Sequence, residues 1–112
     1  ALLNLVVNSR DAMPSGGRLG LRTLTQTFTA SSLRSNDVLQ PGTYVVIEVW
    51  DTGHGMPPDV KRRAFEPFFS TKERGTGLGL ALTQQIVAEH GGSIDVSDNV
   101  PHGTRFAIEL PV

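Results

Sequence analysis

Residues 75–80 read Gly75-Thr76-Gly77-Leu78-Gly79-Leu80, and the ten residues that follow carry a helical apolar pattern. Glycines at every second position let a backbone approach a ligand closely and adopt dihedral angles that other residues avoid. Because the loop leads into a helix, the unpaired N–H groups and the dipole at the helix start would favour an anion. The stretch therefore indicates a phosphate-binding loop or, alternatively, a tight connection without a ligand.

The composition is that of a globular domain. The chain has 112 residues, of which 38% are hydrophobic and 19% are charged, enough for one domain and too few for two. The formal net charge of −1 gives no indication of nucleic acid or an anionic membrane as a partner. The absence of cysteine excludes disulfides and thiolate chemistry. The chain begins without Met inside a helical pattern, so we expect a fragment of a longer protein.

Apolar periodicity predicts seven elements along the chain. Helices are expected over residues 1–13, 57–64 and 78–90, and strands over residues 19–28, 44–50, 93–96 and 104–110. The polar stretch 29–42 is predicted to be a hairpin connection, and 66–76 an irregular loop. The order helix, two strands, helices, two strands predicts an α+β fold with helices on one face of a sheet.

Three polar side chains recur along the first predicted helix. Asn4, Asn8 and Asp11 follow the spacing i, i+4, i+7 and so share one helix face. Mg²⁺ takes oxygen ligands and usually adds substrate phosphates to its shell. One Asn oxygen would complete such a shell without repelling bound phosphates. The alternative is a solvated helix face.

The strand predicted over 44–50 is followed by Asp51-Thr52-Gly53-His54-Gly55. A carboxylate at a strand end is held rigidly and can accept a hydrogen bond from an exocyclic amine, such as that of adenine. Gly53 and Gly55 would leave room for a flat ring. The alternative is an ordinary turn, in which Asp favours the turn and Gly supplies a positive φ.

Aromatic residues are concentrated in Phe65-Glu66-Pro67-Phe68-Phe69, which holds three of the five phenylalanines. They are either core residues or anchors of a lid that docks and releases. Ser70, Thr71, Lys72 and Arg74 follow, and the two cations are suitable partners for phosphate oxygens. As an isolated pair, these cations would be ordinary surface residues.

The three histidines, His54, His90 and His102, do not have the spacing of metal ligands. His90 ends a predicted helix before Gly91-Gly92, where a cation is favourable, so we interpret it as a cap. No serine nucleophile with a partner base can be identified. Taken together, the glycine loop, the strand-end carboxylate and the Asn stripe suggest a nucleotide site that provides for phosphate, adenine and a metal.

These segments resemble the catalytic and ATP-binding domain of bacterial sensor histidine kinases, in the superfamily that also holds gyrase B, Hsp90 and MutL. The stretch 4–13 is similar to the N box, 51–56 to the G1 box, 65–69 to the F box and 75–80 to the G2 box, while 90–94 and 103–106 resemble the closing segment. The resemblance covers nearly the whole chain. It implies a two-layer α/β sandwich of the Bergerat type, with a mixed sheet, helices on one face and a truncated N-terminus.

The resemblance also implies roles for single residues. Asn8 would bind Mg²⁺, Asp51 would bind the adenine amine, and Lys72 would position phosphates as the only residue here with a catalytic part. The residues expected to contact the nucleotide are Asn4, Asn8, Asp11, Asp51, Gly53, Gly55, Met56, Phe68, Lys72, Gly75, Thr76, Gly77, Leu78, Gly79, Leu80 and Thr104. Two departures stand out: Ser9 occupies a position where Ala is usual, and the interval from Phe69 to Gly75 is short, as in the compact-lid branch.

By this resemblance, residues 1–112 form the ATP-binding catalytic domain of a two-component protein histidine kinase. The domain would bring the γ-phosphoryl group of ATP, with Mg²⁺, to a histidine on a separate dimerisation domain. A response regulator receiver domain would be the next partner in the phosphorelay. We expect a cytoplasmic domain without contact to nucleic acid or membrane, and any membrane anchor would lie elsewhere in the parent protein.

Two alternatives stay open. A hydrolytic ATPase of the same superfamily needs a carboxylate that activates water, and Asp11 is shorter than the Glu expected there. A non-catalytic nucleotide sensor would be favoured by the loss of an Asn, Asp or Gly from the boxes, and none is lost.

Overall fold

The computed structural model describes residues 2–30, 40–70 and 78–112. Within them lie the helices α1 (Leu2–Asp11), α2 (Pro58–Arg63) and α3 (Gly79–Glu89) and the strands β1 (Leu19–Phe28), β2 (Gly42–Asp51), β3 (Ser93–Asp98) and β4 (Thr104–Pro111). The order of the elements is the predicted one, and their bounds differ from the predicted bounds by at most two residues. The predicted α+β fold is confirmed.

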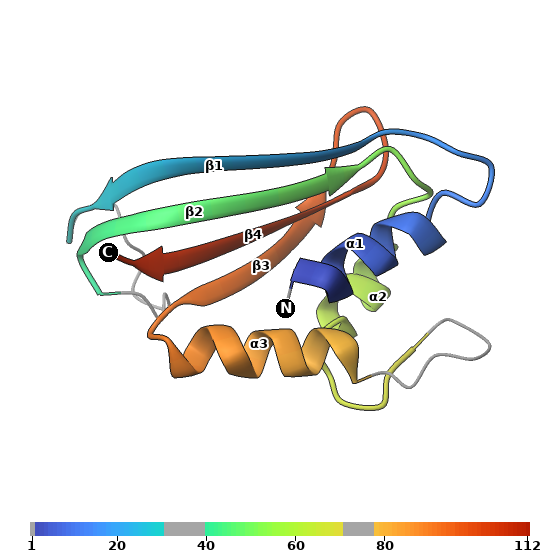
Figure 1. Cartoon of the computed structure of the whole chain (residues 1–112). Coiled ribbons are helices and arrows are strands. Elements are labelled where there is room, and N and C mark those ends of the chain that lie inside the picture. Colours follow the sequence, from blue (N-terminus) through green and yellow to red (C-terminus); the bar gives the residue numbers. More distant parts are fainter. Residues whose placement is uncertain (1, 31–39, 71–77) are drawn as a thin grey trace.

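The four strands form one sheet in the order β1-β2-β4-β3 (Figure 1). Each pair of neighbouring strands in the described residues is antiparallel, so the expected mixed sheet is not found. The reason lies in the connections. β3 follows a crossover through α2 and α3 and runs parallel to β2, but β4 returns from β3 and lies between the two. A parallel neighbour requires such a crossover, and here β4 separates its two strands.

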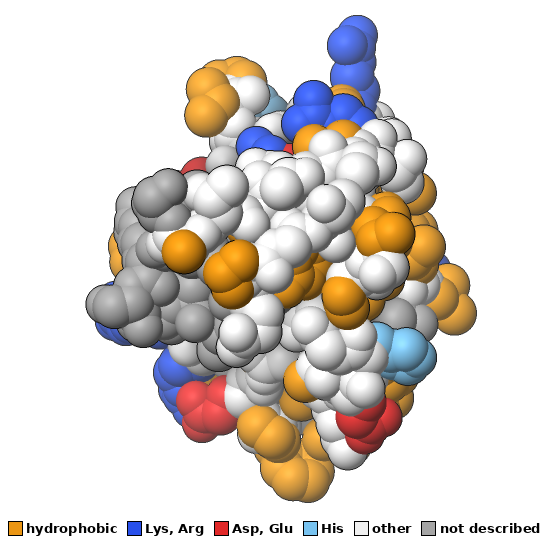
Figure 2. Space-filling view, turned by 90° about the vertical axis from the view of Figure 1, so that its left-hand side faces the viewer, with side chains coloured by type: hydrophobic (Ala, Val, Ile, Leu, Met, Phe, Trp, Pro, Cys, Tyr) orange, Lys and Arg blue, Asp and Glu red, His pale blue; other side chains and the backbone are white. Residues whose placement is uncertain are grey.

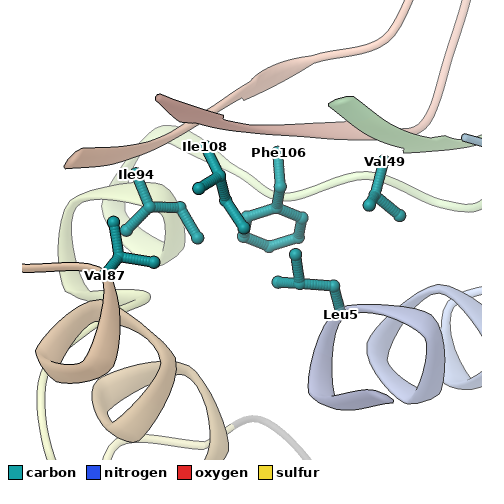
Figure 3. Close-up of a cluster of buried hydrophobic side chains, with 6 residues drawn as sticks. All are labelled: Leu5, Val49, Val87, Ile94, Phe106 and Ile108. Atoms are coloured by element: carbon teal, nitrogen blue, oxygen red, sulfur yellow. The ribbon is translucent and has the colours of Figure 1, made fainter. Parts of the chain in front are cut away.

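The hydrophobic core lies between the sheet and the helices (Figure 3). Its buried cluster consists of Leu5, Val49, Val87, Ile94, Phe106 and Ile108. Leu5 comes from α1 and Val87 from α3, whereas the other four come from the strands. Because side chains alternate along a strand, Val49, Phe106 and Ile108 all point toward the helices (Figure 3).

Helices α1 and α3 lie together beneath the sheet and contact each other (Figure 1). On α3, Thr83 and Val87 are buried, while Leu82 and the N-cap residue Leu78 are exposed. The face of α3 that packs on the core therefore carries Thr83 and Val87, and Leu82 lies outside it. Among the described residues, the three helices lack the length and hydrophobicity of a membrane-spanning segment.

Candidate functional site

Asp51 lies at the end of β2 with only 2% of its surface exposed. Its carboxylate oxygen Oδ1 accepts hydrogen bonds from the backbone N–H groups of Gly53 (2.8 Å) and Thr104 (3.3 Å). Within the described residues, the second oxygen, Oδ2, has no hydrogen-bond partner. Buried carboxylates are stable only when hydrogen-bonded. The backbone thus fixes one oxygen of Asp51 and leaves the other for a further donor.

The turn after Asp51 packs against the end of α1. The N–H of His54 donates a 3.1 Å hydrogen bond to the backbone oxygen of Ala12. Gly53 lies so close to Ala12 that any side chain at this position would overlap it, so only glycine fits. Met56 then packs against the core cluster. The contact brings the predicted G1 segment together with the helix that carries the Asn stripe.

The three members of the Asn stripe have different environments. Asn4 Nδ2 lies 3.4 Å from Oγ1 of Thr83 and so contacts α3. Asn8 Nδ2 donates a 3.1 Å hydrogen bond to the backbone oxygen of Asn4. Asn8 Oδ1 accepts no hydrogen bond in the described part of the chain. Asp11 is exposed and lies 3.3 Å from the Arg10 guanidinium. In Asn4 and Asn8 alike, the printed hydrogen bonds use the side-chain nitrogen, and Asn8 differs in that its bond stays within α1.

The start of α3 lies beside Asn4, whose Nδ2 donates a 3.2 Å hydrogen bond to the backbone oxygen of Gly79. The helix has no side-chain cap at its N-terminus, and Leu80 packs against the core cluster. First-turn N–H groups of a helix lack intrahelical partners and favour an anion. Gly55, in the G1 segment, has a φ of +74°. The predicted phosphate contacts Lys72, Gly75, Thr76 and Gly77 lie outside the described residues.

The phenylalanines of the predicted F box, expected to be either core residues or anchors of a lid, have different environments. Phe65 packs against the core cluster. The Arg63 guanidinium lies 4.1 Å from the ring centre of Phe69 and hydrogen-bonds Glu66, which lowers the pKa of the Glu66 carboxyl from its ordinary value. Phe68 is 78% exposed. Phe65 is thus a core residue and Phe68 a surface residue.

Asn99 lies in the turn between β3 and β4 and was not predicted to be a site residue. Its Nδ2 donates hydrogen bonds to the backbone oxygens of Asp51 (2.8 Å) and His102 (3.3 Å). Thr104, predicted to lie near adenine, is 4% exposed and adjoins the Asp51 carboxylate. Asn favours turns, and that local signal does not indicate contact with Asp51.

The histidines lie at turns and at a helix end. His90 Nδ1 is 2.8 Å from the backbone oxygen of Ile86 at the end of α3, and His102 Nδ1 is 3.3 Å from that of Gly53. In residues 2–30, 40–70 and 78–112, no group of three His, Asp or Glu side chains could hold a metal ion. What the site offers is a buried carboxylate, an amide oxygen and a helix N-terminus, a combination suited to a nucleotide.

Comparison with known proteins agrees with this geometry. Residues 1–112 match the family described as histidine kinase-, DNA gyrase B-, and HSP90-like ATPase. The sensor kinase CckA of Brucella abortus is 49% identical over 112 residues, a region that covers 97% of this chain and 12% of CckA. The chain thus spans about an eighth of the length of that relative.

Solved structures of histidine kinases share the fold. The mycobacterial sensor histidine kinase MprB matches 98% of this chain and 66% of its own with a TM-score of 0.74 and 35% identity. Full-length ShkA in complex with AMPPNP (TM-score 0.71, 31% identity) and ThkA in complex with the response regulator TrrA (0.69, 29%) also match 98% of this chain, and 20% and 27% of theirs. The resemblance predicted from the four boxes is confirmed, and the chain belongs to the histidine kinase-, DNA gyrase B- and HSP90-like ATPase family.

Proposed function

We propose that residues 1–112 are the ATP-binding catalytic domain of a two-component histidine kinase. The domain binds ATP with Mg²⁺ and presents the γ-phosphoryl group to a histidine on a separate dimerisation domain. Family membership and the 49% identity with a sensor kinase support this function.

The observation that carries the proposal is the environment of Asp51. Its Oδ1 is occupied by two backbone amides, so Oδ2 is the acceptor for a ligand. Adenine presents an amine where guanine presents a carbonyl oxygen, and a fixed acceptor discriminates between them. Gly53 and Gly55 add no side chains beside the carboxylate. Met56 and Thr104 complete the proposed base contacts.

The phosphates are proposed to lie between α1 and the start of α3. The hydrogen bond from Asn4 to Gly79 holds these two segments together. Backbone N–H groups at the start of α3 would bind phosphate oxygens. The proposed phosphate contacts are Lys72, Gly75, Thr76, Gly77, Leu78, Gly79 and Leu80, and the exposed Asp11 and Phe68 contact the nucleotide at the rim of the site.

Asn8 is the residue proposed to bind a magnesium ion. Its Nδ2 is bonded to the backbone of α1, which leaves Oδ1 as its oxygen donor. Mg²⁺ is usually bound by one or two protein groups together with substrate phosphates. When bound, the ion would neutralise part of the phosphate charge.

The chain contributes to phosphoryl transfer by positioning. The reaction depends on in-line placement and on charge stabilisation more than on covalent chemistry by the protein. Asp51 holds the base, the α3 N-terminus holds the phosphates, and Lys72 adds a positive charge. The nucleophilic histidine and any base beside it come from the dimerisation domain.

A response regulator receiver domain is proposed as the next partner in the phosphorelay. The complex of ThkA with the response regulator TrrA supports this partner, and the AMPPNP complex of ShkA supports nucleotide binding. The domain is proposed to act in the cytoplasm without contact to nucleic acid or membrane.

Titration calorimetry with ATP, ADP and GTP, with and without Mg²⁺, tests the proposal. ATP and ADP should bind, more tightly with Mg²⁺, and GTP at least about tenfold more weakly, because one charge-assisted hydrogen bond is lost. Steady phosphate release by the chain alone would instead favour a hydrolytic ATPase. Nucleotide binding without transfer to an added histidine-bearing domain would favour a non-catalytic sensor.

A further inference from the structure

A pocket of about 520 Å³ lies on the outer face of the sheet, and its lining includes Arg18, Arg22, Glu48, Trp50 and Arg105. Strand alternation places Glu48 and Trp50 on the face of β2 opposite to Asp51. The helices cover the Asp51 face (Figure 1). In Figure 2, blue Lys and Arg side chains gather at the top of the molecule, on the sheet side. The pocket therefore opens on the face of the sheet opposite to the proposed nucleotide site, although Thr52 and Asn99, which adjoin Asp51, also line it.

A buried carboxylate at this pocket holds two guanidinium groups. Glu48 is 3% exposed. Arg22 Nε on β1 donates a 2.7 Å hydrogen bond to Glu48 Oε1, and Arg105 on β4 forms an ion pair with Oε2. The side chains of Arg22 and Arg105 remain 64% and 44% exposed. Because each guanidinium carries five N–H donors, both keep donors for a further acceptor.

The pocket is lined by more positively charged side chains than negatively charged ones. Three arginines line it against the single carboxylate of Glu48, although the chain as a whole has a formal net charge of −1. Arg18 forms no ion pair within the described residues. A buried Glu is stabilised by its partners, but the additional cation has no such role. The excess charge indicates an anionic ligand.

Trp50 supplies a flat apolar wall. It lies opposite Gly20 in the β1–β2 register, and its ring packs so closely on Gly20 that any side chain there would overlap the indole. The ring is thereby held against β1 beside the guanidinium groups. Flat apolar rings pack well against an aromatic ring.

We propose that this pocket is a second binding site, for a small anion in which a phosphate or carboxylate is carried on a flat apolar body. The anionic group binds Arg18 and the exposed donors of Arg22 and Arg105, and the flat body lies against Trp50. Arginine pairs with both kinds of anion through parallel N–H donors. Phosphate and carboxylate ligands therefore share the chemistry that the pocket recognises.

Trp50 fluorescence tests the proposal directly, because the chain has no other tryptophan. The probes are phenyl phosphate and benzoate, with phenol and inorganic phosphate as controls that carry only the ring or only the charge. The site is supported if at least one aromatic anion gives a saturable change in fluorescence and both controls bind at least about fivefold more weakly. The anion that binds more tightly then identifies the preferred head group. No saturable change with either anion, or equal binding of a control, would overturn it.

Arg18→Gln tests the cation without disturbing the Glu48 pairs. Calorimetry should show phenyl phosphate binding weakened about three- to fivefold, as for an exposed charge contact. ADP binding and the unfolding temperature should be unchanged. Arg62→Gln, at an exposed arginine on α2 that does not line the pocket, is the matched control and should bind like the unmodified chain. Equal phenyl phosphate affinity of Arg18→Gln and Arg62→Gln would contradict the proposal.

Discussion

The side-chain nitrogen of Asn99 donates a 2.8 Å hydrogen bond to the backbone oxygen of Asp51, which joins the β3–β4 turn to the end of β2. The same nitrogen reaches the backbone oxygen of His102 at 3.3 Å, so the turn closes on itself while it holds Asp51. Thr104, just after the turn, binds the Asp51 carboxylate through its N–H. One turn therefore positions both the backbone and the side chain of the residue proposed to select adenine.

Asn99→Ala should destabilise the domain by about 1–3 kcal/mol, because a buried carbonyl loses its donor. For a domain of roughly this size, each kcal/mol lowers Tm by about 4–8 °C. ADP affinity should fall several-fold, since Asp51 is less well fixed. Asn99→Asp should be worse, because an acceptor replaces the donor, and Val100→Ala, at an 86% exposed neighbour, should change little. Thermal unfolding and calorimetry measure both effects, and unchanged values for Asn99→Ala would exclude a positioning role.

Asp51→Asn should weaken ATP binding by about one to two decades. Asparagine can keep an oxygen for the amides of Gly53 and Thr104, but it puts an N–H donor where adenine needs an acceptor. The loss of a charge-assisted hydrogen bond costs roughly 1.5–3 kcal/mol. Calorimetry with ATP and GTP measures the change. Unchanged ATP affinity, or GTP bound as well as ATP by the unmodified chain, would defeat the assignment.

Asn8→Ala should remove most of the Mg²⁺ enhancement of ADP binding and leave metal-free binding nearly intact, because only the Asn8 oxygen is proposed to contact the ion. Asn4→Ala is the comparison. It should lower Tm, because Asn4 links α1 to Gly79 and Thr83 on α3. Calorimetry with and without Mg²⁺ separates the two roles. If Asn8→Ala lost ADP affinity equally with and without Mg²⁺ and also had a lower Tm, Asn8 would be a structural residue.

Ser9→Ala should stabilise the domain by about 1 kcal/mol. The Ser9 hydroxyl is buried and has no hydrogen-bond partner in the described residues, so its removal relieves a desolvation cost. Alanine is also the better helix former. Thr83→Val is the matched contrast, because Thr83 Oγ1 donates a 3.0 Å hydrogen bond to the backbone oxygen of Gly79, and this variant should lose stability. Chemical denaturation gives both values, and a destabilised Ser9→Ala would show that the hydroxyl is satisfied.

The chain should not phosphorylate itself. His54, His90 and His102 lie in turns or at a helix end, where they are not presented to the γ-phosphate. A misplacement of about 1 Å can cost on the order of a hundredfold in rate. Radiolabelled ATP should leave the chain unlabelled and should label an added histidine-bearing dimerisation domain of the parent. Acid-labile phosphate on one of the three histidines would refute this division of labour.

Local patterns were sufficient to predict the helices and strands to within two residues. Such patterns depend on neighbouring residues alone. An example is the alternation along a strand, which puts Val49 and Phe106 on the buried faces of β2 and β4. The strand order was not predictable in the same way. β4 lies between β2 and β3, and this insertion makes neighbouring strands antiparallel where a mixed sheet was expected.

By itself, the sequence determined the order of the elements, the family and the position of Asp51 at a strand end, because each depends on a few neighbouring residues or on a motif of fixed spacing. Only the tertiary structure decided which polar groups meet. Asn99 reaches Asp51 across 48 residues of sequence, Asn4 reaches Gly79 across 75, and Glu48 lies between arginines of two different strands. Such pairs depend on strand register and helix packing, which are set by the whole core and leave no periodic trace along the chain.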